Sequence, residues 1–238
     1  MSGWRSHSGD HPSGIDADAF GLSPPPQARS RRPPTRREQR GLAVLFLVVA
    51  GLVAFGWYSR EQHRPARRTL PAPIHPAVLV VPIGPFPLDR LRDLPHDYGA
   101  AYGLSMNIAE PIALPASAFD ASRRQYVAEG LIAAMRQAYP PAGDPSAIVI
   151  GVTTADVYIR GVAWDWAFAL RQQGTSAVIS VARMPNTKQV NRWTLFGKMM
   201  TREAGFLCFG LPPSDNPYDV LYRDILSVSD LERLFDQL

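Results

Sequence analysis

The chain has very little cysteine and histidine. It contains a single cysteine, Cys208, and five histidines among its 238 residues. A lone cysteine excludes an intrachain disulfide and a zinc site built from cysteines. The last histidine is His96, so no histidine follows it in the sequence. Catalysis by a Ser–His pair needs an imidazole within hydrogen-bond reach, which excludes that chemistry for most of the chain.

Basic residues are concentrated in the N-terminal part of the sequence. Residues 1–70 hold eleven arginines against five acids, a net charge of +6, whereas residues 71–238 hold fourteen basic residues against sixteen acids, a net charge of −2. A nucleic-acid-binding domain carries its lysines and arginines on the folded part. The charge distribution therefore excludes nucleic acid as a partner.

An uncharged segment of eighteen residues, Gly41–Tyr58, separates these two parts. At about 1.5 Å per residue it would span roughly 27 Å, close to the ~30 Å of a bilayer core. More arginines precede it than follow it, which favours an N-terminus in the cytoplasm and residues 71–238 outside. We predict a single-pass transmembrane helix over 41–58, with the lipid bilayer as partner and the cell membrane as location. The alternatives are a buried core helix and a cleaved signal peptide, although Leu52 is a poor residue at the −3 position of a cleavage site.

Composition divides the rest of the chain into three parts. Residues 1–40 are rich in Ser, Gly, Pro and Arg and are predicted to be a disordered tail. Residues 59–76 are rich in Pro and Arg and predict an extended stalk. Residues 77–238 carry the apolar patterns of an α/β domain.

Within this domain, apolar runs predict strands at 77–83, 104–110, 147–153, 164–170 and 175–182. Helices are predicted at 87–94, at 121–138 with Asp120 or Ser122 as cap, at 190–209, and from Ser229. The strand 147–153 is the best candidate for the centre of the sheet, and the Gln-Gly pair after residue 172 favours a hairpin. This order predicts an α/β sheet with an antiparallel section and helices packed on it.

Three segments follow one another in a characteristic order: GVTTADVYIR (151–160), TSAVISVAR (175–183) and KMMTREAGFLCFGLP (198–212). Together they resemble the archaemetzincin group of metzincin-type zinc proteases. In that family a G-V-T-x-x-D strand end is followed by a strand ending in Arg and then by a helix with H-E-x-x-H-x-x-G-x-x-H. The resemblance covers residues 77–234 and implies a metzincin-like mixed sheet packed by helices.

The positions of the zinc ligands depart from this family pattern. Arg202 stands where the first histidine is expected, Phe206 where the second is, and Pro212 where the third is. Glu203 stands at the position of the general base, so it is the candidate, vestigial catalytic residue. At the turn where the family has a methionine, the matching residue is Leu221. Gly205 fits the pattern, whereas Gly210 comes one residue later than the glycine of the family motif.

These substitutions remove the chemistry that holds a catalytic zinc. Such an ion needs three imidazole or anionic ligands and an open position for water. Arg202 is a cation, and Phe206 and Pro212 have no donor atom. Without the metal, Glu203 alone cannot bring the pKa of a water molecule to the neutral range. We therefore predict no cofactor, and zinc is expected only under the alternative of an active enzyme.

The other candidate residues can each be explained by a structural role. Glu203 falls within an apolar helix face, so we expect it to be a structural residue held by Arg183 or Arg160. Asp156 with Asp165 could form an acid–base pair, although acids at strand ends are commonly turn caps. Cys208 is most simply a small buried apolar residue.

The sequence thus favours a non-catalytic, peptide- or protein-binding pseudoprotease. Its cleft could hold a peptide strand along an exposed sheet edge, near Trp164–Asp165–Trp166. The alternative is an active zinc-dependent metalloprotease, or another hydrolase, with an atypical site.

Overall fold

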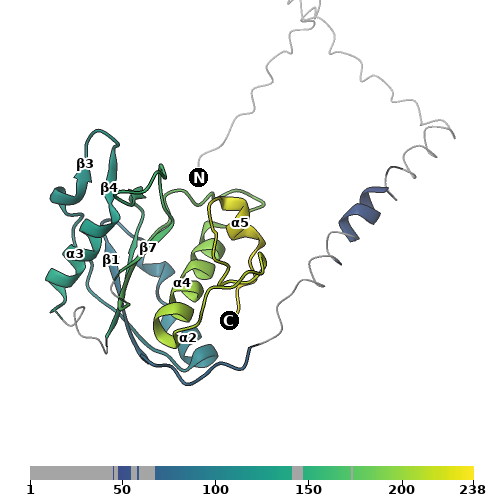
Figure 1. Cartoon of the computed structure of the whole chain (residues 1–238), viewed down its shortest axis with the longest axis horizontal. Coiled ribbons are helices and arrows are strands. Elements are labelled where there is room, and N and C mark those ends of the chain that lie inside the picture. The colour runs from purple at the N-terminus through teal and green to yellow at the C-terminus, as the bar shows by residue number, and fades with distance from the viewer. Residues whose placement is uncertain (1–44, 46–47, 55–57, 59–67, 141–146, 173) are drawn as a thin grey trace, which may run out of the picture. The chain divides into compact units, whose positions relative to one another are not determined.

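The structure is a computed structural model that describes residues 45, 48–54, 58, 68–140, 147–172 and 174–238. The chain divides into two compact units, Met1–Phe55 and Gly56–Leu238. Each is described by itself below (Figure 1).

The first unit corrects the predicted fold class. The described residues of the segment predicted to span a membrane, 45, 48–54 and 58, are helical. No helix among the described residues is long and apolar enough to cross a membrane, so the transmembrane helix predicted over 41–58 is wrong. Residues 41–44, 46–47 and 55–57 of that segment lie outside the described residues.

The other predictions for the N-terminal part stay predictions. The tail 1–40 lies outside the described residues, and the cell-membrane location and orientation are tested by none of them. Of the predicted stalk 59–76, residues 68–76 are described and contact the domain. Arg68 forms an ion pair with the buried Asp219, and the backbone N–H groups of Ile74 and His75 donate to the carbonyl of Cys208 at 2.7 and 3.2 Å.

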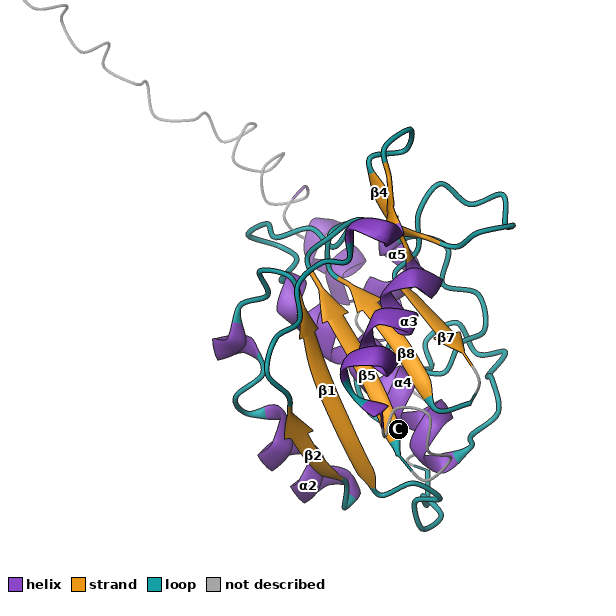
Figure 2. Ribbon diagram, turned by 90° about the vertical axis from the view of Figure 1, so that its left-hand side faces the viewer, coloured by secondary structure: helices purple, strands orange, loops and turns teal. Residues whose placement is uncertain are grey.

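The second unit is built on a five-stranded sheet in the order β2-β1-β5-β8-β7, drawn in orange in Figure 2. Its strands are β1 (Ala77–Ile83), β2 (Ser105–Ile108), β5 (Ile148–Thr153), β7 (Ala169–Gln172) and β8 (Ser176–Ser180). Strands β1, β2, β5 and β8 are parallel, whereas β7 pairs antiparallel with β8. Every residue of β5 is buried, which suits its apolar, β-branched sequence and confirms it as the central strand.

Helices cover both faces of this sheet. On one face lie α2 (Leu94–Tyr102), α4 (Arg192–Phe209) and α5 (Val228–Arg233), and on the other lies α3 (Ala128–Ala138). The side chains of β5 alternate between the two layers, so that Ile150 packs towards α4 and Val149 packs towards α3. The predicted α/β architecture with an antiparallel section is confirmed.

A second, three-stranded sheet replaces part of a predicted helix. It consists of β3 (Phe119–Asp120), β4 (Gln125–Val127) and β6 (Val157–Tyr158). The Asp120 carboxylate accepts from the N–H groups of Ser122 and Arg123 at 2.9 and 3.3 Å. These bonds form the turn between β3 and β4 instead of capping a helix, so the helix predicted from residue 121 begins at Ala128.

The segment predicted as one helix over 87–94 contains two elements. A 3-10 helix, η2, spans Leu88–Arg90, and α2 begins at Leu94 with proline in its first turn. The leucines spaced three apart match the three residues per turn of a 3-10 helix better than the 3.6 of an α-helix. The short 3-10 helix η3 (Ala116–Ala118) precedes β3 and has no counterpart in the prediction.

The helix α4 supplies most of the residues of the candidate site. Its start is fixed by Asn191, whose side chain accepts from the N–H of Trp193, and its end by Gly210, which has φ +61°. Gly205 lets it pack closely, since a Cβ there would lie 2.6 Å from Leu238 Cδ2 and 2.8 Å from Leu221 Cδ2. Leu221 is fully buried, so the segment that matches the family's methionine turn packs against α4.

This packing makes the substitution Gly205→Ala destabilising. We expect a loss of about 1–3 kcal/mol in the free energy of unfolding, because the added methyl group displaces two buried leucines. The matched control is Gly197→Ala on the same helix, where a Cβ would meet no atom within 4 Å. That control should gain up to about 1 kcal/mol from helix propensity. Urea unfolding of the two variants measures both values, and equal stabilities would contradict the packing described for α4.

Candidate functional site

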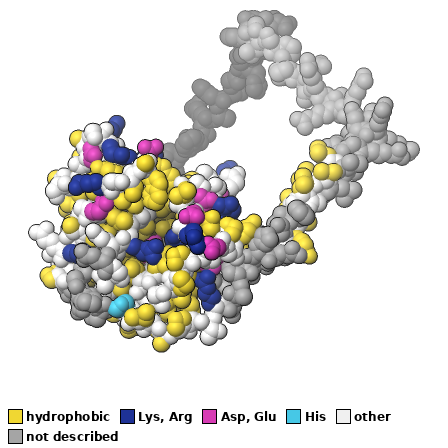
Figure 3. Space-filling view, viewed as in Figure 1, with side chains coloured by type: hydrophobic (Ala, Val, Ile, Leu, Met, Phe, Trp, Pro, Cys, Tyr) yellow, Lys and Arg dark blue, Asp and Glu magenta, His cyan; other side chains and the backbone are white. Residues whose placement is uncertain are grey.

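The candidate site is a cleft with a volume of about 600 Å³ between the sheet edge and α4. One side is formed by β7 and the segment 163–168 that precedes it, and the other by α4 and residues 223–226. Basic, acidic and hydrophobic side chains are interspersed on the face of the molecule that carries α4 and α5 (Figure 3). Two exposed apolar side chains, Trp164 and Leu226, belong to the lining, one on each side. Trp166, in contrast, is half-buried against Phe168.

Among the described residues, no strand pairs with the outer edge of β7, which is the last strand of the sheet and lines this cleft. The N–H of Ser180 donates to the carbonyl of Phe168 at 2.8 Å, so Phe168 faces β8. Backbone groups alternate sides along an antiparallel strand. Those of Ala169 and Arg171 therefore face away from β8. The N–H of Ala167 points the same way and donates to Val157 of β6 at 2.9 Å, which limits the open edge to the residues after it.

Glu203, the candidate catalytic residue, lies in the wall of this cleft and is 2% exposed. Its Oε2 lies 3.2 Å from Nε of Arg171, and its Oε1 lies 3.9 Å from Nε of Arg202. The first contact is an ion pair without hydrogen-bond geometry, since Oε2 accepts no hydrogen bond from any described residue. Glu203 is thus a buried carboxylate between two guanidinium groups.

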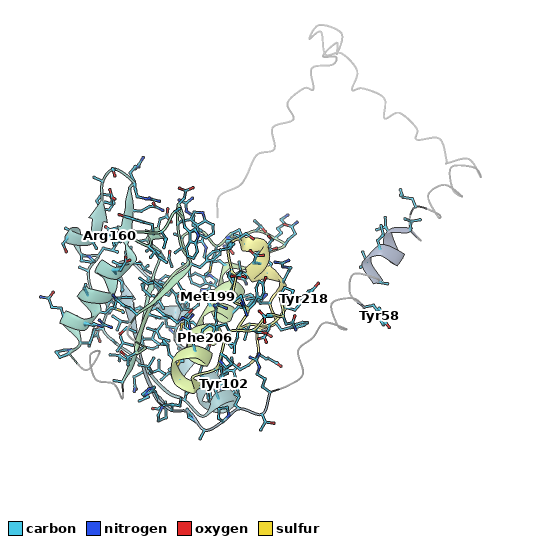
Figure 4. The ribbon with its side chains drawn as sticks, viewed as in Figure 1. Tyr58, Tyr102, Arg160, Met199, Phe206 and Tyr218 are labelled. Atoms are coloured by element: carbon cyan, nitrogen blue, oxygen red, sulfur yellow. The ribbon has the colours of Figure 1, made fainter. Side chains whose placement is uncertain are left out.

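The predicted partners of Glu203 were Arg183 and Arg160, and both are wrong. Arg183 forms an ion pair with Asp156. Arg160 lies on the side of the domain that carries the small sheet, well separated from Phe206 and Met199 of α4 in Figure 4. The partner is Arg171 of β7, a residue that the sequence analysis did not single out. Arg171 follows Ala169 by two positions, so the two side chains lie on the same face of the strand. This alternation is the signal in the sequence that could have indicated Arg171 as the partner of Glu203.

Burial is the main influence on the acidity of Glu203. It raises the pKa of this carboxyl group above its ordinary value, and the nearby Arg171 and Arg202 only partly oppose the shift. A carboxyl group in this environment has a weakened preference for its charged form. A carboxyl group without a metal ion beside it cannot lower the pKa of a water molecule to the neutral range.

Arg202, at the position of the first zinc ligand, has a structural role. Its Nη1 donates to the carbonyls of Val220 (3.4 Å) and Tyr222, and its Nη2 donates to the carbonyl of Arg223 (3.4 Å). Burial lowers its pKa to about 10, so the guanidinium remains charged at neutral pH. Arg202 therefore ties α4 to the loop that passes beneath the cleft.

Phe206, at the position of the second ligand, lies between the two arginines. Its ring centroid is 3.7 Å from Cζ of Arg171 and 4.9 Å from Cζ of Arg202. Both distances are within the range of cation–π attraction. The aromatic face stabilises two positive charges at a position where a histidine would bind a metal cation.

Pro212, at the position of the third ligand, is exposed and does not line the cleft. The helix continues to Phe209 and turns at Gly210, one residue later than the family motif places its glycine. Counting from this turn moves the third position to Pro213, which also lacks a donor atom. Either register leaves the position without a ligand.

The residues present do not fit a catalytic zinc. A guanidinium would repel the ion, and the phenyl and pyrrolidine rings offer it no electron pair. Within the described part of the chain, no three His, Cys, Asp or Glu side chains lie together as a metal-binding group. Cys208 is buried in the core, and burial raises the pKa of its thiol to about 12, which disfavours the thiolate that binds metals.

The other candidate groups are engaged elsewhere. The Asp156 carboxylate binds Arg183 and accepts from Nε2 of Gln125 at 3.1 Å. The Asp165 carboxylate is fully exposed. Asp156 and Arg183 are the Asp and Arg of the two matching strand motifs, and their ion pair joins the ends of β5 and β8. The ion pair gives Asp156 and Arg183 a structural role at the ends of β5 and β8.

Replacement of Arg202 tests its structural role. Arg202→Ala removes the donors to three carbonyls and leaves Glu203 with one cationic partner, so we expect a loss of about 3 kcal/mol in the free energy of unfolding. Arg202→Lys should recover less than half, because a single ammonium group cannot reach all three carbonyls. The control Arg92→Ala, at an exposed position, should change stability by less than about 0.5 kcal/mol. A loss below about 1 kcal/mol for Arg202→Ala would contradict the role.

Replacement of Glu203 tests its electrostatics. Because the pKa is raised in the folded state, the folded chain binds this proton more tightly than the unfolded chain does. Stability therefore falls as pH rises above the unfolded pKa of about 4.3. Glu203→Gln should remove this decrease and be more stable than the wild type at pH 8. The exposed control Glu110→Gln should keep the decrease. Urea unfolding from pH 5 to 8 measures it, and an unchanged pH dependence in Glu203→Gln would be inconsistent with the burial argument.

No protein-family model matches the sequence, and no curated protein matches it. Solved structures are similar in fold. Archaemetzincin from Archaeoglobus fulgidus, complexed with malonate, has a TM-score of 0.56 and 21% identity over 68% of this chain and 94% of that chain. Archaemetzincin from Methanopyrus kandleri has a TM-score of 0.55 and 24% identity over 68% and 88%. A zinc-dependent peptidase from Methanocorpusculum labreanum has a TM-score of 0.54 and 21% identity over 67% and 94%. The chain therefore has the archaemetzincin-like mixed α/β fold.

Proposed function

We propose that this chain is a non-catalytic pseudoprotease whose cleft binds an extended peptide segment. The observation that carries the proposal is the replacement of the ligand positions by the buried Arg202 and Glu203, packed with the partly exposed Phe206 and Arg171 beneath a strand edge. These four residues have the charges and the packing of a structural cluster. The strand edge keeps the unpaired backbone groups that a peptide needs.

Peptide binding is supported by the form of the cleft. The outward-facing N–H and C=O groups of Ala169 and Arg171 could make up to about four hydrogen bonds with an added antiparallel strand. Side chains of that strand would alternate between the cleft and solvent. Trp164 and Leu226 provide apolar contacts on the two sides of the cleft.

Catalysis is disfavoured by the same residues. The alternative of an active hydrolase needs a nucleophile or an activated water next to Glu203. The charged groups paired with it among the described residues are the guanidinium groups of Arg171 and Arg202, and the Phe206 ring packs against both. None of these is a general base or a metal ligand at neutral pH.

A screen of extended peptides against the full-length chain, followed by backbone N-methylation of a binder, tests the proposal. Methyl groups on alternate peptide nitrogens, those facing β7, should lower affinity at least tenfold, because each removes a hydrogen-bond donor and places a methyl group against the strand. Methylation of the intervening nitrogens should change affinity by less than about threefold. Isothermal titration calorimetry measures the affinities of both series. A peptide methylated at one nitrogen is the control for the peptide methylated at the next nitrogen along its chain.

Two results would overturn the proposal. Equal effects of methylation at every position would show that any binding does not extend the sheet. About one zinc ion per chain by metal analysis, together with peptide cleavage that a chelator abolishes, would establish the active-enzyme alternative.

A further inference from the structure

Arg171 is the cationic side chain of the cleft with free hydrogen-bonding capacity. It belongs to β7, its side chain is 36% exposed, and it lines the cleft. Its Nη1 and Nη2 donate no hydrogen bond to any described residue. The other two arginines of the lining are engaged: Arg202 donates to three carbonyls, and Arg223 forms an ion pair with Asp215.

The orientation of the Arg171 guanidinium is fixed on two sides. Its Cζ lies 3.7 Å from the centroid of the Phe206 ring, which supports one face of the group. Its Nε lies 3.2 Å from the buried Oε2 of Glu203. The edge that carries Nη1 and Nη2 is left for a ligand, and a pair of parallel N–H groups on this edge matches the two oxygens of a carboxylate. Because the group is held before a ligand arrives, little conformational entropy is lost on binding.

Asp219 and Asp224 offset the charge of Arg202, which leaves Arg171 with Glu203 as its acidic partner among the described residues. One carboxylate lies between two guanidinium groups, Arg171 and Arg202. Two further acids line the cleft: Asp165, whose nearest cationic partner is Arg123 at 3.9 Å, and Asp224. Neither forms an ion pair with Arg171 within the described part of the chain. A ligand carboxylate at Arg171 would extend the alternation of charges from the buried Glu203 to the open side of the cleft.

The register of an added strand brings such a carboxylate within reach. The backbone of Arg171 faces the open edge, and its side chain lies on the α4 face of the sheet. A peptide residue directly opposite Arg171 would have its Cβ about 5 Å away on the same face. An aspartate or glutamate at that position, or the carboxylate of a chain that ends there, can contact Nη1 and Nη2.

We infer that Arg171 binds a carboxylate of the ligand and makes the cleft selective for acidic or C-terminal peptide segments. This inference rests on the proposed peptide-binding function and names the chemistry of its ligand. The carboxylate comes from an acidic side chain or from the end of the ligand chain, and the two sources are separable by peptide design.

The test uses the full-length chain and a binding peptide in four forms. The position opposite Arg171, identified from the N-methylation series, carries Glu or Gln in a peptide with an amidated C-terminus. In the second pair, the peptide ends at that position as a free acid or as an amide. The wild type should prefer one acid over its neutral partner about tenfold, and the preferred pair identifies the source.

The variant Arg171→Gln should reduce this preference to less than about twofold, because the loss falls mainly on the affinity for the acidic peptide. The matched control Arg223→Gln, in the same cleft, should keep the full preference. A structural role alone would lower the affinities for the acidic and neutral peptides equally. If Arg171→Gln does not fold, Arg171→Lys retains the charge without the parallel N–H pair and should lose most of the preference.

The two levels of the proposal fail in different ways. Peptides that bind with the alternating N-methylation pattern but without an acid preference would overturn the carboxylate inference alone. Peptides that show no such pattern would overturn the proposed function. An acid preference that persists in Arg171→Gln and disappears in Arg223→Gln would move the site to Arg223 and refute the assignment.

Discussion

The contact of the Arg202 guanidinium with the backbone carbonyls of residues 220–223 is the interaction on which the site depends. It joins α4 to the loop beneath the cleft, at the position where the sequence resemblance predicted the first zinc ligand. A fixed side-chain cation makes this connection, and a buried carboxylate and an aromatic face offset its charge. Arg202, Glu203 and Phe206 thus take part in the packing between α4 and its surroundings.

The regular parts of this fold could be predicted from the sequence, because their patterns are local. The strand Ala77–Ile83 and the helix Arg192–Phe209 were close to their predicted bounds. The predicted helix from residue 121 was wrong at its start, since an aspartate caps a turn as readily as a helix. The transmembrane helix predicted over 41–58 was wrong, since no helix among the described residues is long and apolar enough to cross a membrane. Chain length and polarity carry less information than side-chain periodicity.

The site could be predicted only in part. The family pattern placed Glu203, Arg202 and Phe206 together, and the structure brings these three to one cleft. The partner of Glu203 could not be predicted, because Arg171 comes from a strand more than thirty residues away and meets the helix only when the sheet is formed. Arg183 and Arg160 were equally basic, and nothing local distinguished them. Ion pairs between distant elements require the tertiary structure.

The turn at Gly210 has a consequence for any metal site built on α4. The helix ends one residue later than in the family pattern, so the chain that follows it is displaced along the helix axis and around it. Histidines introduced at 202, 206 and 212 would not converge on one point, since the third would approach from an altered direction. A metal site built at these positions would therefore require a deletion near Gly210 as well as three histidine substitutions.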